Sequence, residues 1–194
     1  MCVTSRYGNT GFSLIEVLVT IVILMIGLLG LAGLQGRALT SQLESYQRSQ
    51  ALILVRDMEN RINANRKNAA SYVTEPGTAL GWKSGTTCAP AASSIVGVDK
   101  DKDEWSKALL GCADGNVQSG VPAAGTMIGA RGCVYQIAPP ASGVASTYLA
   151  VVAWQGLNNT KAPDAPAGDC GKNLYGSESL HRVVTLPISI ADLN

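Results

Sequence analysis

The chain of 194 residues has few charged and few aromatic side chains, at 15% and 5% of the total. Its 15 basic and 14 acidic residues leave a formal net charge of +1. A chain so close to neutral has no overall field that attracts a polyanion, so nucleic acid is not an expected partner. A disordered tail of one charge sign is also excluded, because 46% of the residues are hydrophobic.

Residue types that perform catalysis are also scarce. With one histidine, His181, any Ser or Cys nucleophile would need that imidazole as its base, and no nucleophile-elbow motif occurs. We interpret His181, at the start of an expected strand, as a surface residue. The pair Gly171-Lys172 lacks the upstream glycine of a phosphate-binding loop, because Pro166 stands there. The sequence therefore predicts no enzyme and no cofactor.

What the chain has instead is a long apolar run near its N-terminus. Residues 12–34 contain one ionisable side chain, Glu16. A helix of about 18 or more apolar residues spans the roughly 30 Å hydrocarbon core of a bilayer. The alternative, a buried core helix, rarely stays apolar on every face for so long. We therefore predict a membrane helix over residues 12–34, with lipid as one of its partners.

The segments around this run are in an unusual order, because a polar leader, residues 1–11, precedes the run and no A-x-A-like cleavage site follows it. Residues 11–19, GFSLIEVLV, resemble the processing site of type IV prepilins and pseudopilins. In that family a membrane peptidase cleaves after the Gly, methylates the new N-terminal Phe and leaves the apolar helix in place. The resemblance implies cleavage after Gly11, N-methylation of Phe12, and Glu16 as the fifth mature residue, with Ser13 where the family has Thr.

Glu16 needs a compensating partner, because a carboxylate inside an apolar membrane helix costs roughly 2.5 to 3.5 kcal/mol on insertion scales measured with Asp. In prepilins this Glu attracts the N-terminal amine of a neighbouring subunit as that subunit joins the filament. The resemblance implies the same assembly role here. The alternative is a side chain near the interface that reaches the headgroups, which its place early in the run permits.

Four glycines at a spacing of three end the apolar run: Gly27, Gly30, Gly33 and Gly36. Each costs a helix about 1 kcal/mol relative to Ala. The stretch offers either a helix-packing face of small residues or a segment that bends or unwinds when the helix leaves lipid, and both remain open. Arg6 places the leader in the cytoplasm by the positive-inside rule. Residues beyond 34 then lie on the other side of the inner membrane, in the periplasm of a Gram-negative cell.

Beyond the run the pattern stays helical but becomes amphipathic. Apolar residues recur at helical spacing, namely Leu39, Leu43, Tyr46, Leu54, Met58 and Ile62. We predict one helix from about residue 12 to 65, with residues 35–68 as its amphipathic part. The basic residues on its polar face are interpreted as solvated rather than bound to lipid headgroups.

The remaining residues, 69–194, predict a small periplasmic head. Segments rich in β-branched and aromatic residues, 133–137, 148–154 and 182–190, indicate a small antiparallel sheet, with Pro187 favouring an edge. Three strands need a covering layer, and the amphipathic helix is the natural one. The predicted fold is α+β, type IV pilin-like, with a long N-terminal helix packed on the sheet and loops stapled by disulfides.

Removal of the leader would discard Cys2 and leave an even number of cysteines in the expected periplasmic part, Cys88, Cys112, Cys133 and Cys170. This favours disulfides over zinc, since no C-x-x-C pair occurs and His181 is distant in sequence. Four cysteines allow three pairings and the sequence does not select one. We favour Cys88–Cys112 and Cys133–Cys170, because both closures are local within loops rich in Gly and Ala.

The acidic residues at 99–104 begin like a calcium loop. An EF-hand would have Gly at position 104 and Glu at position 110, where this chain has Glu and Leu. We interpret the segment as a solvated charged turn and predict no metal site. The three tryptophans, Trp82, Trp105 and Trp154, are interpreted as core or interface anchors.

The resemblance implies a structural function. Within the prepilins the chain is most similar to the PilV family of minor pilins, in residues 12–34 and, less specifically, in 151–156 and 182–186. Such a subunit is processed by prepilin peptidase and joins other minor pilins and the major pilin in a priming or tip complex on the inner-membrane assembly platform. It supports twitching motility and adhesion. The alternatives are a minor pseudopilin of a type II secretion system and a membrane-anchored periplasmic enzyme or binding protein.

Overall fold

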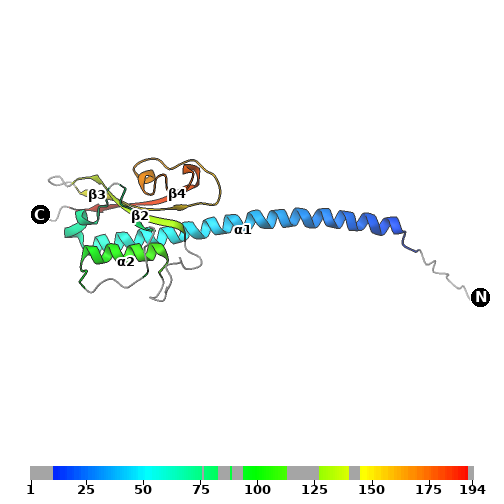
Figure 1. Cartoon of the computed structure of the whole chain (residues 1–194), viewed down its shortest axis with the longest axis horizontal. Helices are drawn as coiled ribbons and strands as arrows, with labels where there is room; N and C mark the ends of the chain where they lie inside the picture. Colours follow the sequence, from blue (N-terminus) through cyan, green and yellow to red (C-terminus); the bar gives the residue numbers. More distant parts are fainter. Residues whose placement is uncertain are drawn as a thin grey trace, which may run out of the picture. The chain divides into compact units, whose positions relative to one another are not determined.

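The structure, a computed structural model, describes residues 11–75, 77–82, 88, 94–112, 127–139 and 145–191. The elements in chain order are α1 (Leu14–Ala64), η1 (Arg66–Tyr72), β1 (Leu80–Gly81), α2 (Val98–Leu110), β2 (Ile128–Ala138), β3 (Ser146–Gln155), η2 (Ala167–Asp169), η3 (Glu178–Leu180) and β4 (His181–Ile190) (Figure 1). The chain divides into two compact units, Met1–Gln42 and Leu43–Asn194, and α1 contributes residues to both.

Helix α1 is a single helix of 51 residues, as the continuous apolar and then amphipathic pattern predicts. It begins at Leu14, where the carbonyl of Ser13 accepts hydrogen bonds from the amides of Glu16 and Val17. The four glycines of residues 27–36 lie inside the helix, and no described atom lies within 4 Å of the position that a Cβ would occupy on them.

The sheet is antiparallel with the strand order β1-β2-β3-β4, so the three predicted strands are confirmed as β2, β3 and β4. Pro187 is on β4, where it lies opposite Leu149 of β3. Strand β4 is at the edge of the sheet, as the presence of Pro187 predicts. The fourth strand, β1, pairs Leu80 and Gly81 with β2 and was not predicted. Two residues are too short to show the alternation by which a strand is recognised in a sequence.

One face of the sheet packs against helices. The core there contains Met58 and Ile62 of α1, Trp105 of α2, and Val152 and Trp154 of β3. Trp105 and Trp154 are buried, as predicted for anchors, whereas Trp82 is 40% exposed. The sheet and its covering helices therefore form the α+β head that the sequence predicts.

The predicted apolar stripe of α1 is wrong in its first half. Leu39, Leu43 and Tyr46 are 61%, 55% and 49% exposed. The buried positions begin later, with Gln47, Ala51 and Val55. The second half of the stripe is confirmed, because Met58 and Ile62 are buried and Leu54 packs against the same core. The prediction selected the largest aliphatic side chains, but the small Ala51 has no exposed surface and lies in the core.

The second face of the sheet has its own cover, which the sequence did not predict. Cys133, Val151 and Ala153 on this face form a separate buried cluster with Cys170 and Tyr175. In Figure 1 the segment between β3 and β4, coloured orange, lies on the side of the sheet opposite α2. Alternate residues of β3 thus point into two different cores, because successive side chains of a strand point to opposite faces.

Trp105 of α2 contacts both α1 and β2. Its indole nitrogen donates a 2.8 Å hydrogen bond to the carbonyl oxygen of Leu54, and the side chain is completely buried. Its ring lies against the backbone of Gly132, where a Cβ would be only 2.2 Å from two ring carbons. Only glycine leaves enough space for the ring at this position of β2.

We expect Gly132→Ala to destabilise the head by about 1–3 kcal/mol, because the added methyl group must displace the buried Trp105 ring. The measurement is urea unfolding of the full chain in lipid nanodiscs, followed by near-ultraviolet circular dichroism. Gly36→Ala is the control, since its Cβ would meet no described atom. Equal unfolding midpoints for Gly132→Ala and the unchanged chain would contradict the packing described for Trp105.

Candidate processing and assembly site

The Gly11–Phe12 bond lies ahead of the first turn of α1. Residues 11–13 are in neither helix nor strand, and the helix begins at Leu14. Phe12 is 84% exposed, and no described atom lies within 4 Å of the Cβ position of Gly11. A peptide bond with exposed, non-helical neighbours reaches a peptidase without unfolding of secondary structure. The residues that resemble a processing site therefore have an accessible geometry.

Glu16 is an exposed carboxylate in the first turn of α1 and the only acidic residue of that turn. This place is favourable for a negative charge, because the helix dipole is positive at the N-terminus. Ion pairs within the described part of the chain do not include Glu16. The geometry leaves the carboxylate open to a cation from another molecule.

Apart from the hydroxyls of Ser13 and Thr20, the helix surface around Glu16 is apolar. The most apolar 18-residue window of α1 has a mean hydropathy of 2.8, and none of it is buried by the rest of the described chain. Ile15 is 68% exposed and Leu29 is 78% exposed. By length and composition this part of α1 is able to cross a membrane. Lipid or other apolar helices must cover it.

The acidic residues at 99–104 lie on a helix, so the predicted charged turn is wrong. Helix α2 begins after Gly97 and ends before Gly111, both with positive φ, and has Asp99 and Asp101 in its first turn. Trp105 and Leu109, four residues apart, form the buried side. The sequence signal that we missed is the i,i+4 spacing of the ion pair Asp103–Lys107.

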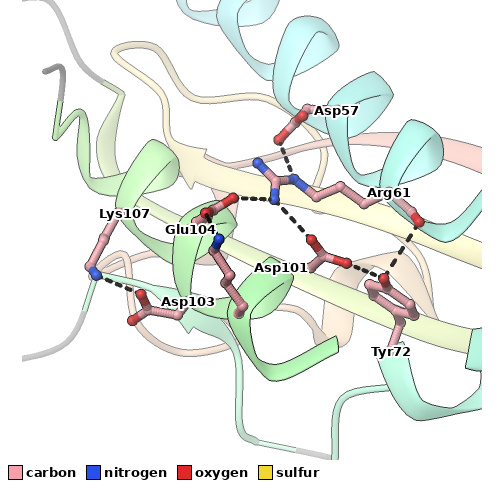
Figure 2. A network of polar contacts seen from close by, with 8 residues as sticks. Asp57, Arg61, Tyr72, Asp101, Asp103, Glu104 and Lys107 are labelled. Atoms are coloured by element: carbon pink, nitrogen blue, oxygen red, sulfur yellow. Dashed lines mark hydrogen bonds and ion pairs between the residues drawn. The ribbon is translucent and has the colours of Figure 1, made fainter. Parts of the chain in front are cut away.

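Arg61 of α1 pairs with two of these carboxylates, Asp101 and Glu104, and with Asp57 of its own helix (Figure 2). Arg61 Nε lies 3.0 Å from Asp57 Oδ2, and its Nη1 lies 2.8 Å from Glu104 Oε2 and 3.3 Å from Asp101 Oδ1. The hydroxyl of Tyr72 also donates to Asp101. No local sequence pattern indicates this network, since Arg61 and Glu104 are 43 residues apart.

The network changes the acidity of its members. The hydrogen bond from Arg61 lowers the pKa of Glu104 below its ordinary value of 4.5. Burial, and then the hydrogen bond to Asp101, raise the pKa of Tyr72 to about 12. An internal guanidinium therefore serves as the cation for this acidic cluster. The part of the chain that the structure describes has no group of three or more His, Cys, Asp or Glu placed to hold a metal ion.

His181 is buried, with 1% of its surface exposed, so its interpretation as a surface residue is wrong. Its Nε2 lies 3.0 Å from the carbonyl oxygen of Cys170 and its Nδ1 lies 2.9 Å from Glu178 Oε2. Both ring nitrogens therefore lie within hydrogen-bond distance of an oxygen atom. The hydrogen bond with His181 lowers the pKa of Glu178. Because both nitrogens have a partner, the imidazole has a structural role and connects β4 to Glu178 and Cys170.

The structure contains the disulfides Cys88–Cys112 and Cys133–Cys170, which is the pairing that local closure favours. The bridges span 24 and 37 residues. In the chain-entropy account, loops of these lengths stabilise a fold by roughly 3–4 kcal/mol each. The second bridge joins β2 to the segment that covers the second face of the sheet.

Glu44 of α1 binds the beginning of this covering segment, a contact that the sequence did not predict. Its Oε1 accepts hydrogen bonds from the amides of Leu157 at 3.2 Å and Asn158 at 3.0 Å, and lies 3.6 Å from Arg182 Nη2. Arg182 in turn donates to the carbonyl oxygens of Ser179 and Asn158. These contacts join residues more than a hundred positions apart, and no local pattern indicates them.

The fold and the site define a class of protein: a subunit with an exposed apolar N-terminal helix that continues into a small, disulfide-linked α+β head. The family model described as the prokaryotic N-terminal methylation motif matches residues 6–32, and the model described as type IV pilin Tt1218 matches residues 33–102. No curated protein and no solved structure matches the chain.

The chain is a type IV prepilin-like protein, a pilin or pseudopilin, which confirms the resemblance seen in residues 11–19. The matched pilin family is structural rather than enzymatic. Membership implies assembly with other pilins and handling by prepilin peptidase. The methylation motif and the apolar helix fit a membrane-anchored pilin.

We expect Arg61→Met to destabilise the head near neutral pH by about 1–3 kcal/mol, because charge-assisted hydrogen bonds to its carboxylates are lost. Arg61 lowers the pKa of Glu104 in the folded chain. The resulting stability is present above the ordinary pKa of 4.5 and is lost as pH falls through the lower, folded value. Arg61→Met therefore also reduces the loss of stability on acidification.

The measurement is urea unfolding of the full chain at neutral pH and at a pH of about 3. Lys161→Met is the matched control, since it removes an ion pair whose side chains are 82% and 84% exposed, and such pairs contribute about 1 kcal/mol or less. An identical pH dependence in Arg61→Met and the unchanged chain would show that Arg61 does not set the acidity of Glu104.

Proposed function

We propose that the protein is a minor pilin of the type IV pilus. Prepilin peptidase cleaves between Gly11 and Phe12 and methylates Phe12, and residues 12–34 anchor the mature chain in the inner membrane. The observation that carries this proposal is an exposed, non-helical Gly11–Phe12 bond directly followed by a fully exposed apolar helix. The basic leader residue Arg6 supports a cytoplasmic leader and a periplasmic head. The disulfides support an oxidising compartment for the head.

Assembly in this proposal depends on Glu16. Cleavage creates a positive amine on Phe12 of each subunit, and an amine of one subunit pairs with Glu16 of its neighbour. Both charges are costly in an apolar environment when alone, and pairing them reduces that cost. The exposed apolar surface of α1 then packs against α1 of neighbouring subunits. This accounts for a carboxylate in a helix segment, residues 12–34, that has no other charged side chain.

The minor-pilin role is supported by the similarity to the PilV family in residues 12–34, 151–156 and 182–186. We propose that the subunit joins other minor pilins and the major pilin in a priming or tip complex on the inner-membrane assembly platform, and so supports twitching motility and adhesion. Deletion of the gene then abolishes surface pili and twitching. A loss of protein secretion with normal pili would instead establish the minor pseudopilin of a type II secretion system.

We expect the membrane-extracted protein to have a mature chain that begins at methylated Phe12, lacking the eleven leader residues. Intact mass and N-terminal sequencing measure this in cells with and without prepilin peptidase. Gly11→Val leaves the full-length chain in both strains, whereas the control Gly36→Ala is processed normally. An uncleaved Met1 in peptidase-containing cells, or loss of all residues through 34, would overturn the pilin pathway for this chain.

We expect Glu16→Gln to be processed and membrane-bound but to enter pili about tenfold less, or lower still, because the charge-assisted contact with the neighbouring amine is lost. The measurement is the ratio of the protein in sheared pili to that in membranes, by immunoblot. Thr20→Val is the control, since it removes another exposed polar group of the same helix, whose hydroxyl donates only to Val17. Equal incorporation of Glu16→Gln and the unchanged chain would exclude the pairing.

A further inference from the structure

The head contains a cavity of about 330 Å³ at one end of the sheet. Its walls are largely apolar and include Trp82, Ile128 and Leu174, which are 40%, 46% and 54% exposed. Gln155, which lies opposite Ile128 in the β2–β3 register, adds one amide. Pockets of this size and mostly apolar character are typical of small-molecule sites.

Arg131 on β2 is the one charged residue among the described residues that line the cavity. Arg131 is 9% exposed. Its Nη1 donates a 2.6 Å hydrogen bond to the carbonyl oxygen of Trp82, and its guanidinium carbon lies 5.8 Å from the centre of the Trp82 ring. Within the described residues its Nε has no hydrogen-bond partner and no carboxylate forms an ion pair with it.

A buried cation without a counter-ion is costly, because it has lost water and gained no anion in return. The other buried or half-buried charges that we describe in the head have such partners: Arg61 has three carboxylates and Arg182 has Glu44. Arg131 differs from them and lies against an open cavity. Its guanidinium fork suits a carboxylate in particular.

The walls of the cavity are fixed by the fold. Trp82 continues the β1–β2 pairing through a 2.9 Å hydrogen bond from its amide to the carbonyl oxygen of Ala130. The hydroxyl of Tyr175 donates to the carbonyl oxygen of Gly129 at 3.2 Å. Gly129 has a φ of +61°, and a Cβ there would lie 3.4 Å from the Tyr175 ring. The aromatic walls are thus preformed, which reduces the ordering cost of binding.

We propose that this cavity binds a small organic monocarboxylate with a planar apolar body, whose carboxylate pairs with Arg131 and whose body lies against Trp82 and Leu174. One cation matches one negative charge, and the apolar walls match an apolar body rather than a polyanion or a sugar. The proposed site uses residues of the head alone and is independent of processing and filament assembly.

The probe is 3-phenylpropionate, compared with 3-phenylpropionamide, a neutral ligand of nearly the same shape. Binding to the full chain in phosphatidylcholine nanodiscs is measured by isothermal titration calorimetry. We expect the acid to bind about tenfold more tightly than the amide, or better, because a hydrogen bond to a charged group is lost in the amide. Absence of saturable acid binding, or equal affinities for acid and amide, would overturn the proposal.

Two variants separate the charge from the apolar wall. Arg131→Met reduces the ratio of acid to amide affinity to about one, while Trp82→Ala weakens both ligands and keeps their ratio. Leu157→Ala, at a side chain 39% exposed outside the cavity lining, changes neither affinity. An unchanged ratio in Arg131→Met would show that the carboxylate binds elsewhere.

Arg131→Met could fail to fold, because Arg131 also bonds the Trp82 carbonyl. In that case the proposal is tested on the unchanged chain, by nuclear magnetic resonance of the indole N–H signals of its three tryptophans. The acid must shift the indole signal of Trp82 and leave those of the buried Trp105 and Trp154 in place. Acid binding with no movement of the Trp82 signal overturns the site.

Discussion

The exposed apolar surface of α1 is the constraint on which the rest of the molecule depends. Fifteen Leu, Ile, Val and Met side chains between residues 14 and 34 are at least 46% exposed. Burial of each contributes about 1.5–3 kcal/mol, so together they favour an apolar environment by roughly 20 kcal/mol or more. This far exceeds the few kcal/mol that burial of one carboxylate costs. The cost of burying Glu16 is therefore too small to outweigh the preference of this segment for an apolar environment.

The head has the opposite property, because its core is complete without the apolar run. Both buried clusters contain only residues from Ala51 onward, within the unit Leu43–Asn194. Alternate residues of β3 contribute to the two clusters, and a disulfide joins β2 to the segment that covers the second face. A head that is stable by its own contacts leaves the surface of the first half of α1 available for lipid and for other subunits.

The sequence predicts the parts of this structure that depend on local patterns. A continuous apolar run followed by helical spacing gives α1, and β-branched segments between Gly and Pro clusters give β2, β3 and β4. It fails where the pattern is short or where tertiary contacts decide. The sequence did not predict helix α2, because its first half alternates Asp and Lys and its apolar side contains few residues, among them Trp105 and Leu109. The burial of His181 depends on Glu178 and on the carbonyl of Cys170, a contact that exists only after the covering segment has folded.

The charged residues of this chain are of two kinds, those paired within the fold and those without an ion pair among the described residues. Arg61, Glu44 and His181 each lie in contacts that the fold completes by itself, with partners on other elements. Glu16 and Arg131 differ, since neither forms an ion pair within the described residues. One is an anion on an apolar helix and the other a buried cation beside an apolar cavity. Because an unpaired charge is costly in an apolar environment, both residues carry our proposals: that Glu16 pairs with a neighbouring subunit and that Arg131 pairs with a ligand.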